Sequence, residues 1–220
     1  SLGKSAVRWL RSNDVHCTPM ILTEPNETPS NRLGTYYLET GYGIRPSKVI
    51  YDRKYSSIGM ASREDFNWET ILDGAEWFHF TGITPALGDN VAQITLDALK
   101  VCKKKGIKVS CDLNFRKKLW TSEKAGTVMG ELCEYVDVCI ANEEDAEKVF
   151  GIKPDHNDVE GGKLNREGYI DVAKKLSDRF GFEKVAITLR ESISASDNNW
   201  AAMLYADGEA YFSKKYAVHI

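Results

Sequence analysis

The stretch IKVSCDLNFRKKLW, residues 107–120, joins a short apolar run to a group of strongly polar side chains. The run IKVSC has the composition of a buried β-strand, and Asp112, Asn114 and Arg116 follow it at alternate positions. In open parallel sheets, ligands bind at the carboxyl ends of the strands, where loops carry polar groups beyond the core. This stretch therefore predicts a strand that leads out of the core into a binding site.

Strand-like and helix-like segments alternate on both sides of this stretch, from about residue 69 onward. The expected strands cover residues 75–83, 107–113, 136–141 and 184–189. The expected helices, in which apolar residues recur at helical spacing, cover residues 89–106, 123–136, 143–151 and 166–181. Apolar strands separated by helices are typical of a parallel sheet that is covered on both faces. The sequence thus predicts the α/β class, with a doubly wound, mostly parallel sheet flanked by helices.

Two segments depart from this alternation. Residues 33–53 have the pattern of two strands around a connection that contains Gly and Pro, which predicts a small β hairpin beside the main sheet. Residues 199–216 hold two alternating runs joined by ADGE, which predicts an antiparallel hairpin. We therefore expect an α/β core formed by residues 1–30 and 62–220, with a β lid formed by residues 31–61.

The composition of the chain favours a small-molecule ligand. Its 220 residues are 42% hydrophobic, and its net charge of −3 gives no reason to expect nucleic acid or a membrane surface as a partner. The five cysteines have irregular spacing and no CxxC pair, so they predict small buried side chains in a reducing compartment. We expect neither a leader nor a membrane span, and a cytoplasmic location.

Polar residues follow four of the expected strands, in the sequences TGITPAL, DLNFR, ANEED and TLRES. Four such strand ends in succession indicate a site at the carboxyl edge of the sheet. Arg116 is the candidate anion-binding residue, because a guanidinium binds a carboxylate or phosphate by two hydrogen bonds; the alternative is a surface ion pair with Asp112 or a nearby Glu. The lid offers Tyr36, Tyr51 and Arg53 as further polar contacts, or as an aromatic stripe that packs the hairpin onto the core.

In the ANEED run, Asn142 and Asp145 lie three residues apart on one face of an expected helix. One interpretation is that they organise a hydrated Mg2+ beside nucleotide phosphates. The other is purely structural, because such residues cap a helix start and interact favourably with its dipole. His79, in the run WFHF, is expected to be a hydrogen-bonded core residue rather than a catalyst.

Five stretches together resemble the ribokinase-like carbohydrate kinases and, within them, the 2-keto-3-deoxygluconate kinase branch: TGITPAL, SCDLNFRKKLW, NEEDAEKVFG, VAITLRESISAS and RPSKVIYDR. The likeness spans nearly the whole chain, and DLNFRKKLW with VIYDR is the part most specific to this branch. The resemblance implies a ribokinase-like fold whose β lid often serves homo-oligomer contacts. It also implies transfer of the γ-phosphoryl group of ATP to a sugar hydroxyl, with Mg2+.

The resemblance further implies roles for individual residues. Those expected at the sugar acid are Tyr36, Tyr51, Arg53, Ile83 and Arg116. Those expected at the nucleotide are Asn114 and Asn142, near the phosphates, and Thr188, Arg190 and Ser194, in a segment that forms part of the ATP wall. Asp145 is expected to hold Mg2+ through water.

The chain departs from the family pattern in two ways. The Asn-x-x-Glu magnesium motif of the family ends here in Asp145 rather than Glu. An early Gly-Gly substrate motif and a late GxGD motif, whose Asp is the catalytic base, do not occur in these residues. We therefore expect these residues to be the middle of a longer kinase, with the catalytic Asp beyond Ile220.

Three functions remain open at this point. The favoured one is an ATP-dependent kinase that phosphorylates 2-keto-3-deoxygluconate, because a neutral sugar would not require the arginines Arg53 and Arg116. The second is a fructokinase or ribokinase that acts on a neutral sugar. The third is a non-catalytic protein that binds a sugar acid.

Overall fold

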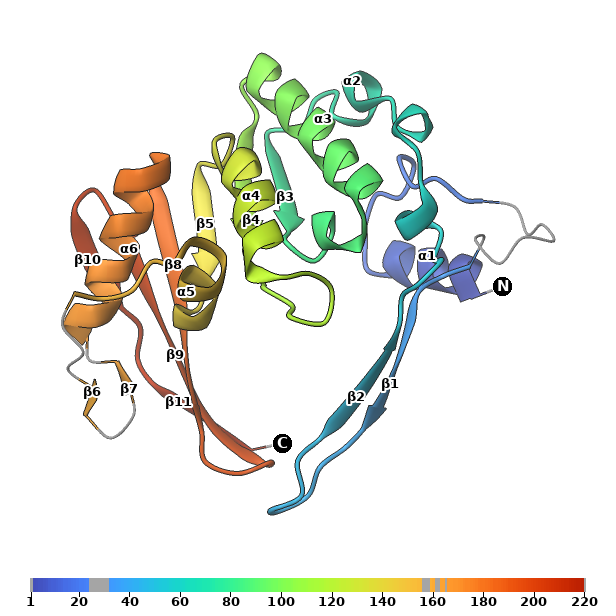
Figure 1. The fold of residues 1–220 in the computed structure, drawn as a ribbon. Helices are drawn as coiled ribbons and strands as arrows, with labels where there is room; N and C mark the ends of the chain where they lie inside the picture. The colour runs from blue at the N-terminus through green and yellow to red at the C-terminus, as the bar shows by residue number, and fades with distance from the viewer. Residues whose placement is uncertain (1, 24–31, 156–158, 161–162, 165, 220) are drawn as a thin grey trace.

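The computed structural model describes residues 2–23, 32–155, 159–160, 163–164 and 166–219 (Figure 1). Its centre is a seven-stranded sheet in the order β10-β9-β8-β5-β4-β3, with β11 also paired to β9. The strands of this sheet are β3 (Trp77–Thr81), β4 (Lys108–Asp112), β5 (Val138–Ala141), β8 (Lys184–Ser192), β9 (Asp197–Ala206), β10 (Glu209–Phe212) and β11 (Tyr216–His219). Strands β3, β4, β5 and β8 run parallel, whereas β9 is antiparallel to its neighbours. The predicted mostly parallel α/β sheet is confirmed.

Six α-helices belong to the described part of the chain: α1 (Leu2–Ser12), α2 (Trp68–Ile71), α3 (Asp89–Lys105), α4 (Ser122–Cys133), α5 (Glu143–Phe150) and α6 (Arg166–Phe180). Local sequence sets their ends. Helix α4 begins after Thr121, whose hydroxyl accepts a hydrogen bond from the Lys124 amide at 3.2 Å. Helix α3 ends at Gly106, which has the left-handed conformation that glycine adopts without strain. These four long helices α3, α4, α5 and α6 match the predicted ones.

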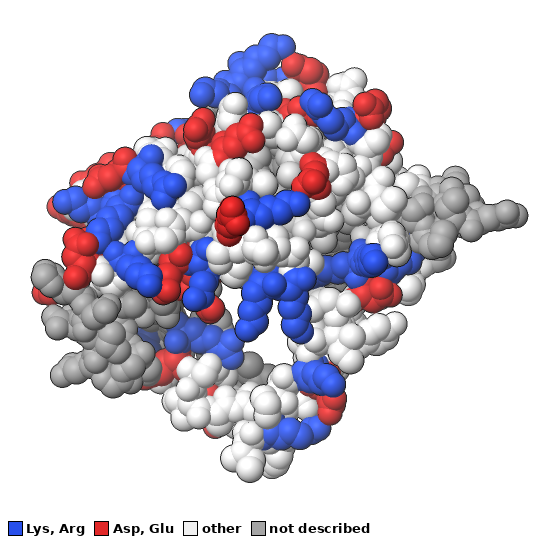
Figure 2. Space-filling view, in the orientation of Figure 1, with Lys and Arg blue, Asp and Glu red and all other residues white. Residues whose placement is uncertain are grey.

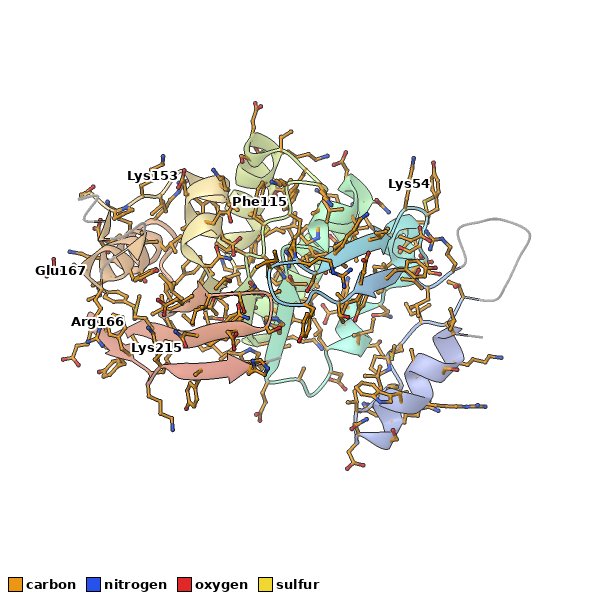
Figure 3. All side chains as sticks on the ribbon, turned by 90° about the horizontal axis from the view of Figure 1, so that it is seen from below. Lys54, Phe115, Lys153, Arg166, Glu167 and Lys215 are labelled. Atoms are coloured by element: carbon orange, nitrogen blue, oxygen red, sulfur yellow. The ribbon has the colours of Figure 1, made fainter. Side chains whose placement is uncertain are left out.

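The hydrophobic core lies between the sheet and helices α3 to α6, which pack against the same face of the sheet (Figures 1 and 3). Right-handed crossovers between neighbouring parallel strands place successive helices on one side. Alternate strand residues therefore point into this core, and Val109, Cys111, Cys139 and Val185 are fully buried there. Trp77 points to the other face and is exposed.

The sheet is extended at one edge by antiparallel strands. Strands β8 and β9 pair along their length, from Lys184 opposite Ala206 to Ser192 opposite Asn198. The turn between β9 and β10 has positive φ at Asp207 and Gly208, as a two-residue hairpin turn requires, which confirms the hairpin predicted at ADGE. Strand β11 continues along the same side of β9 as β10. Strand β11 was not predicted from the sequence.

A two-stranded antiparallel hairpin, β1 (Thr35–Glu39) with β2 (Lys48–Asp52), stands apart from the main sheet (Figure 1). It lies within the segment predicted as the β lid. Most of its side chains are exposed on both faces of the hairpin. A second short pair, β6 (Val159–Glu160) with β7 (Lys163–Leu164), precedes α6.

Two further expectations are tested by burial. All five cysteines are buried and free, as predicted. His79 is hydrogen-bonded to the Ser110 hydroxyl at 2.8 Å, but the expectation that it lies in the core is wrong. Its strand, β3, is an edge strand of the sheet, and His79 is on the exposed face.

In the part of the chain that the structure describes, no helix is both long and apolar enough to cross a membrane.

Candidate functional site

Backbone hydrogen bonds join the carboxyl ends of three parallel strands. The Gly82 amide, just beyond β3, donates to the Asp112 carbonyl of β4 at 2.8 Å, and the Leu113 amide, just beyond β4, donates to the Ile140 carbonyl of β5 at 2.9 Å. A Cβ atom at Gly82 would lie only 2.1 Å from the Leu113 carbonyl oxygen, so only glycine fits there. The polar strand ends predicted from sequence are thus brought together at one edge of the sheet.

The connection between β4 and α4 carries two of the candidate residues. Asn114 has a positive φ of 40°, and its amide group donates to the Thr81 hydroxyl at 3.2 Å. The same hydroxyl lies 3.5 Å from the amide of Ile83, which is half-buried. Arg116 is exposed, and its carbonyl closes a turn with the Leu119 amide at 2.8 Å. Asn114 and Ile83 are therefore tied to the end of β3, while the guanidinium of Arg116 is left accessible.

The start of α5 is closed by a reciprocal capping box. The Asn142 side chain accepts a hydrogen bond from the Asp145 amide at 2.8 Å, and the Asp145 carboxylate accepts one from the Asn142 amide at 3.3 Å. The other carboxylate oxygen of Asp145 accepts a hydrogen bond from the Phe115 amide at 2.9 Å. Asp145 is 5% exposed.

Few of the described side chains at this site could act as ligands for a metal ion. Among the described residues, no group of three or more His, Cys, Asp or Glu side chains is placed to hold a metal ion. Each oxygen of Asp145 already accepts a backbone hydrogen bond, and the carboxylate is almost entirely buried. The geometry of Asp145 therefore matches the structural interpretation better than a ligand reaching hydrated Mg2+.

Two carboxyl groups at this edge have raised pKa values. Burial is the main cause for both Asp112 and Asp145, because desolvation disfavours the charged form. For Asp112, the opposing influences are the charge of His79, the Asn114 amide and the charge of Arg116. For Asp145, they are mainly the Phe115 and Asn142 amides. Arg116 thus lies close enough to favour the ionised form of both carboxyl groups.

The lid hairpin brings its three candidate residues together. Tyr36 and Tyr51 are paired across β1 and β2, with ring centroids 6.2 Å apart. The guanidinium of Arg53 lies 4.0 Å above the centre of the Tyr51 ring, a cation–π contact that holds its orientation. The structure describes no hydrogen bond between these three residues and the strand-end residues. A role for the lid in homo-oligomer contacts stays a prediction.

The tip of the lid reaches the far side of the site. The Ala195 amide, in the turn between β8 and β9, donates to the Gly43 carbonyl in the turn between β1 and β2, at 3.3 Å. Figure 1 shows these two turns meeting below the carboxyl ends of the parallel strands. In the space-filling view an opening remains between the hairpin and the α/β core, and Lys and Arg side chains border it (Figure 2). The site is therefore a basic hollow framed by the lid, the strand ends and the β8–β9 hairpin.

The candidate nucleotide residues lie on the β8–β9 hairpin. Thr188 and Arg190 are exposed, and Ser194 caps the turn by accepting the Asp197 amide at 2.9 Å. Asn198, which the sequence analysis missed, is 3% exposed and accepts two hydrogen bonds from Arg190, at 3.2 and 2.9 Å. Asn198 lies opposite Ser192 in the hairpin, and this pairing can be recognised only from the register between β8 and β9.

The guanidinium of Arg190 is fixed from two sides. Besides the two bonds to Asn198, it lies 5.3 Å from the centre of the Trp200 ring, on the neighbouring strand. A guanidinium held in this way keeps further N–H groups free for an anion. The segment is thus equipped to contact a phosphate.

Comparison with known proteins agrees with this geometry. The model of the pfkB family of carbohydrate kinases matches residues 1–191. A crystal structure of 2-dehydro-3-deoxygluconokinase from Thermotoga maritima is 51% identical, with a TM-score of 0.90, over 100% of this chain and 63% of that chain. A PfkB family carbohydrate kinase from Listeria grayi is 32% identical, with a TM-score of 0.85, over 99% of this chain and 62% of that one.

A curated relative differs in its sugar. The 2-dehydro-3-deoxygalactonokinase of Haloferax volcanii is 32% identical over 190 residues, which are 86% of this chain and 54% of that protein. The chain thus spans less than two thirds of the length of each of these proteins. The family model nevertheless covers most of the chain, including the strand ends, the lid and all but the last residue of β8. The chain belongs to the pfkB family of carbohydrate kinases, whose ribokinase-like fold it has.

Proposed function

We propose that the intact protein uses ATP to phosphorylate the terminal hydroxyl of 2-keto-3-deoxygluconate, which is 2-dehydro-3-deoxygluconate, giving the 6-phosphate. The observation that carries this proposal is the pair Arg53 and Arg116, which lie on two separate elements that border the basic hollow. A substrate carboxylate gives such guanidinium groups a partner, whereas a neutral sugar does not. The similarity to the Thermotoga maritima enzyme supports the same substrate.

The residues of this chain would act by binding and orientation. Arg53, held over the Tyr51 ring, would hold the carboxylate from the lid side, and the hydroxyl groups of Tyr36 and Tyr51 would bind sugar oxygens. Arg116 would reach the substrate or the transferring phosphoryl group from the strand ends. These contacts align the attacking hydroxyl, which is the main requirement of phosphoryl transfer.

The nucleotide would lie along the β8–β9 hairpin. There Arg190, fixed by Asn198, would face phosphate oxygens, and Thr188 and Ser194 would line the wall. Asn114 and Asn142 would stand near the phosphates at the strand ends. Mg2+ carried by the ATP phosphates would neutralise the charge that develops during transfer. The base that accepts the hydroxyl proton is not among the residues assigned here.

The epimeric sugar acid 2-keto-3-deoxygalactonate is a second candidate substrate. The Haloferax volcanii relative named for this sugar favours it. Both acids carry the carboxylate that Arg53 and Arg116 would bind, so these arginines do not distinguish between them. The kcat/KM values of the intact protein for the two acids will determine which is preferred.

The proposal is tested by ADP release from the intact protein with each sugar acid, fructose and ribose. Replacing Arg53 by Ala should raise KM for the keto acid about 10- to 100-fold, because a hydrogen bond to a charged group contributes about 1.5–3 kcal/mol. The matched control is Lys54→Ala, the neighbouring cation, which points outward in Figure 3. We expect this control to leave KM unchanged.

Two outcomes would reject the proposed activity or substrate, and a third would reject the role of the lid. Turnover of fructose or ribose without turnover of either keto acid would indicate a kinase for neutral sugars. Calorimetric binding of a keto acid without any ADP release would indicate a non-catalytic binding protein. An Arg53→Ala variant with an unchanged KM for the keto acid would remove the role assigned to the lid.

A further inference from the structure

Asp145 makes one more hydrogen bond than its place in the helix requires. As the third residue of α5, it completes the capping box through one oxygen, which binds the Asn142 amide at 3.3 Å. Its other oxygen accepts the Phe115 amide at 2.9 Å, from a residue 30 positions earlier in the chain. A carboxylate that only capped the helix would leave this second oxygen to solvent, yet Asp145 is 5% exposed.

The bond to Phe115 fixes the loop that carries the candidate binding residues. Phe115 lies between Asn114 and Arg116, and its side chain packs against the hydrophobic core. The loop is anchored on one side by the buried Leu113 and on the other by the turn that begins at Arg116. Between these anchors, the peptide of Phe115 is held by the Asp145 carboxylate.

The length of the side chain matters for this contact. A glutamate at this position would be longer by about 1.5 Å, one carbon–carbon bond. The aspartate is short enough to bond the two amides from within the fold. A longer side chain would move its carboxylate relative to these amides and disturb the bond to Phe115.

We propose that Asp145 is a positioning residue for the sugar-acid side of the site: through the Phe115 amide it sets the placement of Arg116 and Asn114, and it is not the residue that holds Mg2+. This inference rests on the proposed function for its kinetic readout, although its structural readout does not. It departs from the role that the family pattern implies for this position.

The two roles give opposite kinetic patterns in the intact protein. Asp145→Asn keeps the shape of the side chain but turns an NH2 group toward one of the two backbone amides, so one hydrogen bond is lost. We expect KM for the keto acid to rise about tenfold or more, as the loss of a charge-assisted hydrogen bond predicts. The Mg2+ concentration that gives half of the maximal rate should stay close to that of wild type, because in the proposed role the Asp145 carboxylate bonds two backbone amides and neither the ion nor its waters.

A second variant and a control separate positioning from general damage. Asp145→Glu keeps the charge but displaces the carboxylate, so it should also raise KM for the keto acid. Glu144→Gln changes an exposed carboxylate on the same turn of α5, and it should change neither KM nor the Mg2+ requirement.

The structural readout is amide hydrogen exchange of the peptide that covers residues 113–120, measured by mass spectrometry without any ligand. Exchange there should be faster in Asp145→Asn than in wild type and unchanged in Glu144→Gln. Faster exchange together with a wild-type enzyme that turns over no keto acid would reject the proposed function and leave the positioning role intact. Unchanged exchange, or a raised Mg2+ requirement with an unchanged KM for the keto acid, would overturn the positioning role.

Discussion

Replacing Gly82 by Ala tests the close approach on which the site is built. A Cβ atom at residue 82 would lie 2.1 Å from the Leu113 carbonyl oxygen and 3.1 Å from its carbon. Leu113 cannot retreat freely, because it is fully buried and its amide is bonded to the Ile140 carbonyl at 2.9 Å. Strand β3 would have to move away from β4 by about 1 Å to reach an ordinary contact distance.

The magnitude follows from what this movement breaks. The bond from Gly82 to the Asp112 carbonyl, at 2.8 Å, would be lost or weakened, and so would the bond from Asn114 to Thr81, at 3.2 Å. The loss of two hydrogen bonds costs about 1 kcal/mol each, and overpacking costs about 1–3 kcal/mol. Together they lower the free energy of unfolding by about 3–5 kcal/mol. For a domain of about 150–250 residues, this loss corresponds to a fall in Tm of about 6 °C or more.

The measurement is thermal unfolding of the intact protein, with Gly130→Ala as the control. Gly130 lies in α4, and a Cβ atom there would meet nothing within 4 Å, so alanine should raise the stability by up to about 1 kcal/mol through its helix propensity. We also expect the keto-acid KM of Gly82→Ala to rise, because Thr81 and Asn114 move with the strand end. A Tm of Gly82→Ala within about 2 °C of wild type would refute the reasoning, because the fold would then accommodate the extra methyl group without losing stability.

Two further predictions concern other parts of the site. Replacing Asn198 by Ala should free Arg190 and raise KM for ATP several-fold without changing KM for the keto acid. Asn198→Asp keeps the acceptor but adds a negative charge beside Arg190, so it should also raise KM for ATP, and an ATP titration of each variant decides this. Asp112 has a pKa raised by burial, so the stability that its protonated form provides is lost as pH rises through the folded-state pKa. Asp112→Asn should therefore have a higher Tm than wild type at pH 7 and about the same Tm as wild type near pH 3, below the ordinary aspartate pKa of 3.8. Equal Tm values of variant and wild type at pH 7 would contradict this.

Most of the fold could be predicted because its signals are local. The helix that ends at Gly106 and the turn at Asp207 and Gly208 are marked by residues whose conformations need glycine or tolerate positive φ. Strand β11 was missed because its four residues are exposed and carry no burial pattern, and its pairing with β9 is a long-range contact. His79 was misplaced for a similar reason: its sequence neighbours are aromatic, but only the strand order shows that β3 is an edge strand.

The candidate site was predicted as a set of residues rather than as a set of contacts. The capping box of Asn142 and Asp145 follows from their spacing, and the sequence analysis named it as one of two interpretations. The bond from Phe115 to Asp145 joins two loops that are 30 residues apart, so no local pattern encodes it. The same holds for Asn198, whose hydrogen bonds to Arg190 depend on the hairpin register.

The three backbone clamps at the strand ends explain how loop residues acquire fixed positions. Gly82 binds the Asp112 carbonyl, Leu113 binds the Ile140 carbonyl, and Phe115 binds the Asp145 carboxylate, so each segment is held by the next element of the fold. Residues between successive clamps are already ordered before a ligand binds. Their polar side chains can therefore contact the ligand without a further loss of backbone conformational entropy. Substitutions at the clamps should therefore change the affinity for the sugar acid even though these groups do not touch it. The effect should be largest for Asp145, because a single carboxylate side chain makes that clamp.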